Sequence, residues 1–176
     1  MTRLGLTDYL GLMENVSIKK IKERKELLEI VGRERALGRR IVFTNGCFDL
    51  IHVGHIKLLE TARRLGDCLI VALNTDASIR RIKGDKRPIL DESQRGHILG
   101  AFQAVDYVTF FDEDTPEALI SEIRPDVLVK GGDYQMDGVV GRQIVWDDGG
   151  RVVLCPPVCH RSTSSILNEI LQRFTE

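Results

Sequence analysis

Cysteine is scarce in this sequence, which has four in 176 residues: Cys47, Cys68, Cys155 and Cys159. Small secreted domains that are held together by disulfides have a much higher density of cysteine, so we expect reduced thiols here. The gap between Cys155 and Cys159 is also longer than the two-residue gap of a zinc knuckle, and no second cysteine pair has metal-ligand spacing. We therefore expect no metal centre built by the protein.

The sequence also lacks an excess of charge of one sign and lacks long apolar runs. It has 25 Lys and Arg against 26 Asp and Glu, a formal net charge of -1. Proteins that adhere to nucleic acid or to anionic membranes usually carry a basic excess, so we expect neither partner. No apolar run approaches the roughly 20 residues of a transmembrane helix, and no signal-peptide core follows the first residues. These absences predict a cytoplasmic protein.

Three familiar motifs are missing from the sequence as well. There is no Walker A sequence, no Gly-x-Gly-x-x-Gly after the first predicted strand, and no Gly-x-Ser-x-Gly elbow. Their absence argues against P-loop kinases, ordinary dehydrogenases and serine hydrolases.

The sequence does contain enough apolar residues, 43% against 29% charged, for one domain with a covered sheet. Runs of β-forming residues alternate with helical patterns along the chain. We predict strands at 40–45, 69–73, 107–111, 127–130 and 152–155. We predict helices at 18–38, 55–66, 91–105 and 138–148. Two more are predicted from their first residues: one begins at Pro116 with Thr115 as its cap, and the closing helix begins after a cap at Ser162 or Thr163.

This alternation predicts an α/β fold, because parallel strands need crossover helices that cover both faces of the sheet. We expect a single Rossmann-like, doubly wound domain with a mainly parallel five-stranded sheet. It should span residues 18–176, after an N-terminal arm at 1–17 that shows no clear period. Such sheets bind ligands at the carboxyl ends of their strands, where polar residues stand at 44–49, 74–76, 130–134 and 160–164.

His52 and His55 are three residues apart where a helix is predicted to start, so both rings can lie on one side of its first turn. A helix N-terminus offers free N–H groups and partial positive charge, and Gly54 lets an anion approach the backbone. Together they indicate a phosphate cradle with two imidazole donors. Capping or surface histidines are the alternative, as are zinc ligands completed by Cys47.

Residues 44–55, Thr-Asn-Gly-Cys-Phe-Asp-Leu-Ile-His-Val-Gly-His, resemble the opening motif of the cytidylyltransferase-like nucleotidyltransferases, whose shared signature is His-x-Gly-His. The similarity runs from about Ile18 to the C-terminus. Within that superfamily, the blocks at 74–78, 83–84, 87–88, 105–108, 111–116 and 124–134 resemble adenylyltransferases that make ADP-activated heptose. Those enzymes are often the C-terminal half of a bifunctional protein with a sugar kinase. No kinase-like segment precedes residue 18, so we expect any such kinase to be a separate chain.

The resemblance implies transfer of AMP from ATP to D-glycero-β-D-manno-heptose 1-phosphate, with release of pyrophosphate, in lipopolysaccharide or other surface glycan synthesis. It implies ATP and a sugar 1-phosphate as partners, Mg²⁺ carried with the ATP, and a homodimer or higher homo-oligomer. Alternatives are cytidylyl or adenylyl transfer to glycerol 3-phosphate, ethanolamine phosphate, or a flavin or pantetheine precursor. A non-catalytic nucleotide-binding module and a zinc or redox protein are further alternatives.

The resemblance also implies roles for individual residues. The expected catalytic residues are His52, His55, Lys83 and Arg95. The expected nucleotide-binding residues are Thr44, Asn45, Gly46, Cys47, Phe48, Gly54, His55, Lys130, Gly131, Ser162, Thr163 and Ser164. The expected substrate-binding residues are Asp49, Asn74, Asp76, Arg87, Asp133, Tyr134 and Arg161. The alternative for Asp76 and Asp133 is that they form turns. Lys130 could instead be a charge in solvent at the end of a strand, and Ser162 and Thr163 could simply cap the closing helix.

The closing motif departs from the pattern of these relatives. They usually have Tyr-Ser-Thr-Thr, where this chain has Arg161-Ser162-Thr163-Ser164. Serine keeps the hydroxyl of threonine, but Arg161 in place of an aromatic residue changes the expected pocket wall. Because related glycerol-phosphate cytidylyltransferases have an Arg-Thr pair before their Ser-Thr-Thr, the sequence leaves both the base and the acceptor open.

Overall fold

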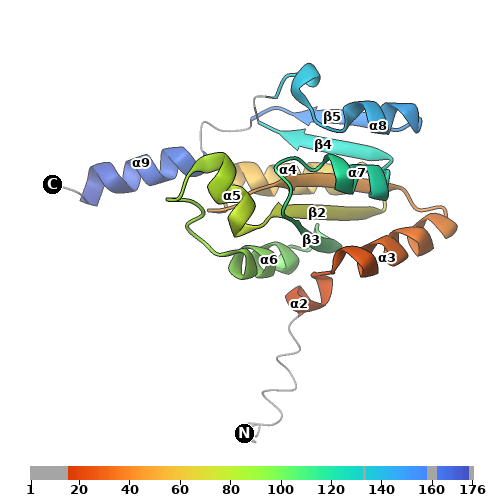
Figure 1. Cartoon of the computed structure of the whole chain (residues 1–176), viewed down its shortest axis with the longest axis horizontal. Coiled ribbons are helices and arrows are strands. Elements are labelled where there is room, and N and C mark those ends of the chain that lie inside the picture. The colour runs from red at the N-terminus through yellow and green to blue at the C-terminus, as the bar shows by residue number, and fades with distance from the viewer. Residues whose placement is uncertain (1–15, 133, 158–161, 175–176) are drawn as a thin grey trace, which may run out of the picture.

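The sheet of this protein has five strands, all parallel, in the order β3-β2-β1-β4-β5. The computed structural model describes residues 16–132, 134–157 and 162–174. The strands are β1 (Ile41–Gly46), β2 (Cys68–Asn74), β3 (Tyr107–Phe111), β4 (Val127–Gly131) and β5 (Arg151–Cys155). This architecture, shown in Figure 1, confirms the predicted α/β fold with its five-stranded doubly wound sheet.

The strand order reverses between β1 and β4. The chain builds one half of the sheet outward from β1 through β2 to β3, then returns to place β4 on the other side of β1. Thr44 pairs with Val129 near the carboxyl ends of these two strands. In open parallel sheets a ligand crevice forms at such a reversal, because the adjoining connections leave in opposite directions.

Helices cover both faces of the sheet. They are α2 (Val16–Lys20), α3 (Arg24–Ala36), α4 (Val53–Arg63), α5 (Asp76–Lys83), α6 (Glu92–Ala101), α7 (Glu117–Ile123), α8 (Arg142–Asp147) and α9 (Thr163–Phe174), with a 3-10 turn at Met136–Gly138. Side chains of α3, α7 and α8 pack on one face, and those of α4 and α6 pack on the other. No helix in the described part of the chain is long and apolar enough to cross a membrane.

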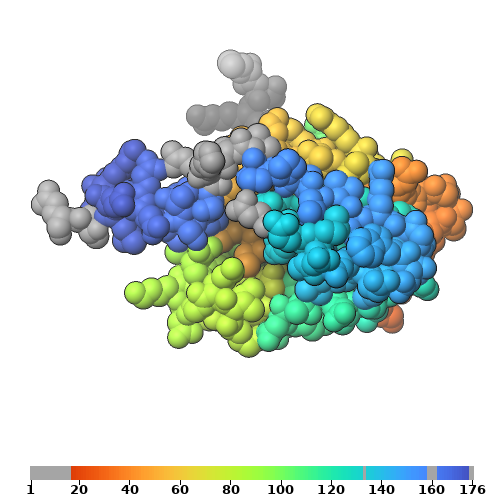
Figure 2. Space-filling view, turned by 90° about the horizontal axis from the view of Figure 1, so that it is seen from above, coloured from red at the N-terminus to blue at the C-terminus, as the bar shows by residue number. Residues whose placement is uncertain are grey.

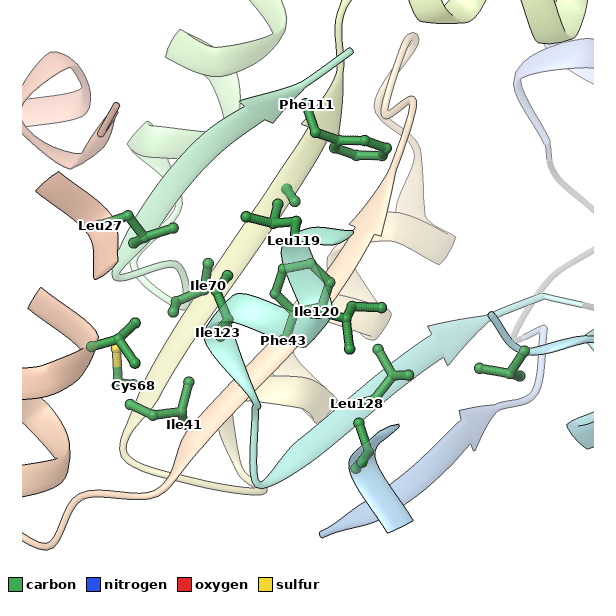
Figure 3. Close-up of a cluster of buried hydrophobic side chains, with 14 residues drawn as sticks. Leu27, Ile41, Phe43, Cys68, Ile70, Phe111, Leu119, Ile120, Ile123 and Leu128 are labelled. Atoms are coloured by element: carbon green, nitrogen blue, oxygen red, sulfur yellow. The ribbon is translucent and has the colours of Figure 1, made fainter. Parts of the chain in front are cut away.

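The two faces explain why the strands are apolar without alternation. Phe43, Ile70 and Leu128 point to the face with Leu27 and Leu119, as Figure 3 shows. Their neighbours Val42, Val71 and Val129 point to the opposite face, against Leu59 of α4 and Leu99 of α6. Because successive strand residues alternate between faces and both faces are covered, all of β2, residues 41–44 of β1 and residues 127–130 of β4 are buried. The outer strands β3 and β5 are only partly buried.

The predicted helix at 18–38 is wrong as one continuous element. It is split into α2 and α3, because Ile21 forms a parallel bridge with Val108 of the outer strand β3. The backbone N–H of Lys22 donates to the Val108 carbonyl at 2.8 Å. An outer strand has one row of unpaired backbone groups, and pairing them with this segment covers part of that edge.

Two other predicted helices are too long. The helix predicted at 91–105 ends at Ala101, and Lys20 Nζ donates to the carbonyls of Phe102 and Val105 beyond its end. The helix predicted at 138–148 is a 3-10 turn followed by α8. Gly141 separates them with a φ of 83°, and a Cβ there would lie 2.6 Å from Ile120 Cδ1. The close contact with α7 therefore breaks that helix.

Helix starts also differ from the predictions. Thr115 is not the cap of α7, because the Pro116 carbonyl accepts the first helical bond, from Ile120 N at 2.9 Å. Helix α4 begins at Val53 and not near His55. Helix α5 was not predicted, although Thr75 caps it with an Oγ1 that accepts from Ser78 N at 3.1 Å.

The closing helix α9 has the predicted cap, since Ser162 Oγ accepts from Ser165 N at 3.1 Å. No described residue of α9 is buried, and Phe174 at its end is 80% exposed. Figures 1 and 2 show α9 extending away from the sheet. Its apolar stripe therefore contributes nothing to the core of the domain.

Glycine at position 100 is required by the contact between α2 and α6. A Cβ at Gly100 would lie 2.4 Å from the Ser17 carbonyl oxygen, whereas a Cβ at Gly32 in α3 would meet nothing within 4 Å. We expect Gly100→Ala to lower the free energy of unfolding by about 1–3 kcal/mol, because backbone must move. Gly32→Ala should raise it by about 0.5–1 kcal/mol through helix propensity. Urea denaturation measures both, and equal effects of the two variants would contradict the role of the contact.

Candidate functional site

A cavity of about 770 Å³ lies at the carboxyl ends of the strands where the strand order reverses. The loop after β1 and the first turns of α4 form one side of it. The ends of β4 and β5, the segment after β5 and Ser162 form the other side. The sheet topology thus brings together segments that are far apart in the sequence, as expected for a doubly wound fold.

The two histidines cap the N-terminus of α4 and line this cavity. The backbone N–H of Gly54 donates to His52 Nδ1 at 3.2 Å, and the N–H of His52 donates to His55 Nδ1 at 3.4 Å. Since each Nδ1 accepts a hydrogen bond, the ring proton of each neutral histidine resides on Nε2. The backbone therefore selects the tautomer that leaves two Nε2–H donors for a ligand.

The packing around these rings fixes their position. Their ring centroids are 3.9 Å apart, and that of Phe48 lies 5.0 Å from His55. A Cβ at Gly54 would come within 2.9 Å of His52 Cε1, so glycine is needed there for the His52 ring as well as for an approaching anion. The space for the His52 ring and the space for an anion are thus both provided by the first turn of α4.

Burial keeps the histidines uncharged. It lowers the pKa of His52, and it lowers the pKa of His55 to about 4, with a smaller contribution from the charge of His52. At neutral pH both rings are therefore neutral hydrogen-bond donors. Positive partial charge at this end of the cavity comes from the dipole of α4, whose N-terminus faces it.

Burial also keeps the described cysteines protonated. It raises the pKa of Cys47 and Cys155, and it raises that of Cys68 to about 12. A protonated thiol is a poor nucleophile and a poor zinc ligand. Across the described residues, no group of three or more His, Cys, Asp or Glu side chains could hold a metal ion. Cys159 lies outside those residues.

Arg95, which was predicted to be catalytic, is fully buried in this structure. Its guanidinium donates to the carbonyls of Leu90, Cys47 and Asn74 at 3.1, 2.7 and 2.9 Å. It also forms an ion pair with Asp76 Oδ1 at 2.7 Å. Arg95 does not line the cavity, and its contacts tie the carboxyl ends of β1 and β2 together behind it.

Asp49, which was predicted to bind substrate, is 1% exposed. Its carboxylate accepts from Arg87 Nε at 2.8 Å and from the backbone N–H groups of Ile89 and Leu90 at 2.9 to 3.0 Å. These contacts fasten the segment before α6 to the loop after β1. Neither Asp49 nor Arg87 lines the cavity.

The remaining predicted residues divide into two groups. Those that line the cavity are Asn45, Gly46, Cys47, Phe48, Gly54, Lys130, Gly131, Tyr134 and Ser162, with the two histidines. Those that do not line it are Thr44, Asn74, Asp76, Lys83, Thr163 and Ser164. Asp133 and Arg161 lie outside the described residues.

The residues of the second group have other surroundings. Thr44 is completely buried within β1, and Asn74 Nδ2 donates to Ser78 Oγ at 3.0 Å. Thr163 Oγ1 donates to the Leu50 carbonyl at 3.3 Å. Lys83 is exposed at the end of α5, and its charge lowers the pKa of Cys47 against the larger effect of burial.

The sequence analysis missed part of the cavity wall. Helix α4 contributes Lys57, Leu58 and Thr61, and β5 with the segment after it contributes Val153, Leu154, Cys155, Pro156 and Pro157. Helical spacing from His55 to Leu58 places both on one side of α4, so this signal could have identified Leu58. Gly131 faces it, because a Cβ there would lie 3.0 Å from Leu58 Cδ2.

Several known proteins are similar to this chain. Residues 43–149 match the family model described as cytidylyltransferase-like. The bifunctional protein HldE of Trichlorobacter lovleyi is 56% identical over 160 residues, which cover 91% of this chain and 33% of that protein. HldE of Geobacter sulfurreducens is 53% identical over 167 residues, which cover 95% of this chain and 34% of that protein. This chain thus spans about a third of the length of these relatives.

Solved structures show the same architecture. The lipopolysaccharide core biosynthesis protein from Thermoplasma volcanium has a TM-score of 0.58 and 28% identity, over 70% of this chain and all of that one. Pantoate-beta-alanine ligase from Francisella tularensis has a TM-score of 0.55 at 17% identity, over 82% of this chain and 68% of that one, and is similar in fold alone.

The family match contains one side of the cavity and part of the other, whereas β5, the segment after it and Ser162 lie beyond the matched residues. It includes the loop after β1, the histidine-capped start of α4 and the end of β4. With this match covering more than half of the chain and a cavity suited to phosphate groups, the chain belongs to the cytidylyltransferase-like family and is a nucleotidyltransferase.

Proposed function

We propose that this nucleotidyltransferase transfers AMP from ATP to D-glycero-β-D-manno-heptose 1-phosphate and releases pyrophosphate. The product is ADP-heptose, a precursor for lipopolysaccharide or another surface glycan. The observation that carries the proposal is the pair of Nε2–H donors that the capped start of α4 presents to the cavity. The similarity to about a third of the length of the HldE relatives supports the choice of substrates.

The geometry suits a direct displacement at phosphorus. His52 and His55 donate hydrogen bonds to oxygens of the α-phosphate and stabilise the charge that develops on them. An oxygen of the sugar phosphate attacks the α-phosphorus in line, and the bond to the β-phosphate oxygen breaks. Pyrophosphate leaves with the electron pair of that bond. Such chemistry needs alignment and electrostatic support, and no covalent enzyme intermediate.

Mg²⁺ enters this scheme as part of the substrate, MgATP. The ion neutralises the triphosphate and favours departure of pyrophosphate. The carboxylate of Asp49, the acidic residue closest in sequence to the histidine pair, already accepts hydrogen bonds from Arg87, Ile89 and Leu90. We therefore assign Mg²⁺ to the nucleotide and not to a protein cage.

A pyrophosphate-release assay tests the proposed function. Each nucleoside triphosphate is combined with heptose 1-phosphate, glycerol 3-phosphate, ethanolamine phosphate, and flavin and pantetheine precursors. We expect turnover with ATP and heptose 1-phosphate. Turnover with CTP but none with ATP would refute adenylyl transfer. Nucleotide binding by calorimetry without pyrophosphate release would favour a non-catalytic binding module.

The role of His55 can be separated from its role as a cap. In His55→Asn, the side-chain oxygen can replace Nδ1 as acceptor for the His52 N–H, but no group replaces Nε2–H. We expect kcat to fall about 10²–10³-fold, as for loss of one transition-state donor. The melting temperature should stay close to that of the wild type. His55→Ala should lose the same activity and also about 1 kcal/mol of stability, because the cap is lost. Near-normal kcat in His55→Asn would refute the donor role.

The lowered histidine pKa values predict a specific pH dependence of stability. Between pH 6.5 and about 4 the unfolded chain binds a proton at His55 that the folded chain does not. Protonation of His55 therefore does not reduce the free energy of unfolding above pH 6.5. Below pH 6.5 it lowers the free energy of unfolding by up to about 1.4 kcal/mol per pH unit. Unfolding measurements on the wild type should show this slope, and His55→Asn should show less of it. An NMR titration of His55 with a midpoint near 6.5 would contradict the prediction.

In this proposal Arg95 is a positioning residue. Removing its guanidinium leaves three carbonyls and the Asp76 carboxylate without their buried donor. We expect Arg95→Met to lower the free energy of unfolding by about 3–5 kcal/mol, measured by urea denaturation. Arg80→Met, an exposed position on α5, should change it by less than about 0.5 kcal/mol. If Arg95→Met were as stable as Arg80→Met, the positioning role would be wrong.

A further inference from the structure

Lys130 is a buried cation at the point where the strand order reverses. It follows Val129 in β4, and Asn45 follows Thr44 in β1, one residue beyond the last pair of these strands. Lys130 is 5% exposed and lines the cavity. Its Nζ donates to Asn45 Oδ1 and lies 5.6 Å from the centroid of the Tyr134 ring.

Among the described residues, the groups in contact with this ammonium group are neutral. Within the described part of the chain, no carboxylate is within ion-pair distance of Lys130, and its Nζ contacts an amide oxygen and an aromatic face. Burial lowers the pKa of Lys130 to about 8, so the group is still mostly protonated at neutral pH. A buried charge with only neutral partners costs folding free energy. Its presence in the cavity therefore needs another explanation.

The proposed reaction supplies one. It brings two phosphate groups together, and both are anionic. The histidines that face them are neutral at neutral pH, because burial lowers the pKa of both rings. Among the described residues that line the cavity, the other cation is Lys57, which is half exposed and paired with Glu60 at 3.2 Å. Lys130 is thus the buried cationic side chain available to a ligand in this cavity.

We propose that Lys130 Nζ binds a phosphate oxygen of the bound substrates, and that Asn45 orients the ammonium group for this contact. An ammonium has three N–H donors, and Asn45 accepts from one of them, so others are free to meet a ligand. The phosphate belongs either to the nucleotide, as its α-phosphate, or to the acceptor. This inference rests on the proposed function, because that function supplies both phosphates.

The test is the phosphate affinity of Lys130→Met, which keeps the length of the side chain and removes the charge. Calorimetry with AMP, adenosine and inorganic phosphate separates the sources. If the nucleotide phosphate is bound, Lys130→Met should weaken AMP binding about 30-fold, equivalent to about 2 kcal/mol, and leave adenosine binding unchanged. If the acceptor phosphate is bound, the variant should weaken inorganic phosphate and leave AMP unchanged. Unchanged binding of all three would overturn the proposal.

A second variant keeps Lys130 and cancels its charge. In Asn45→Asp the new carboxylate lies beside Nζ and pairs with it. The phosphate ligand that binds more weakly to Lys130→Met, either AMP or inorganic phosphate, should therefore also bind more weakly to Asn45→Asp, by a similar factor. The melting temperature of Lys130→Met should equal or exceed that of the wild type, because an uncompensated buried charge is removed. Lys25→Met, on the exposed surface of α3, is the matched control and should change none of these values. Wild-type phosphate affinity in Asn45→Asp would count against the proposal.

These measurements stand apart from the test of the proposed function, because binding needs no turnover. If the wild type fails to release pyrophosphate but loses phosphate affinity in Lys130→Met, the reaction assignment fails and the role of Lys130 stands. If the wild type turns over heptose 1-phosphate and Lys130→Met binds all three probes normally, the reaction assignment stands and the proposed role of Lys130 fails. In the active enzyme, KM for ATP and KM for the sugar phosphate, measured separately, should identify the same phosphate as the calorimetry.

Discussion

The start of α4 has to satisfy backbone N–H groups that have no helical partner, and the site depends on how it does so. His52 and His55 accept two of these N–H groups through their Nδ1 atoms. The same bonds select the tautomer and leave both Nε2–H donors for the cavity. A contact that stabilises the helix thus also fixes the donors that the proposed phosphate site needs, and Gly54 is required because a Cβ would touch the His52 ring.

Behind this cradle, two buried charged side chains hold the loops in place. Arg95 donates to backbone carbonyls just after β1 and at the end of β2, and Asp49 accepts from backbone N–H groups before α6. Their partners are mostly backbone atoms, so they fix the course of the chain more than the chemistry of the surface. Neither residue lines the cavity, and their contacts hold the backbone segments next to it.

The electrostatics of the cavity are divided between its two sides. The histidine side offers neutral donors and the partial charge of a helix N-terminus, whereas Lys130 offers a full charge between neutral partners. Donors that are neutral and already fixed need no proton transfer to support a developing charge. The full charge stands at the reversal between β1 and β4, where the two halves of the sheet meet.

The sequence by itself determined the α/β class, the five strands and the histidine pair at a helix start, because periodicity and helix caps are local properties. It could not show that residues 18–38 are split by a bridge to β3 or that α9 extends away from the sheet. Nor could it distinguish Arg95, buried behind the cavity, from Lys130, buried within it. Only the tertiary structure decided these points, because the direction and partners of a charged side chain depend on segments far away in the chain.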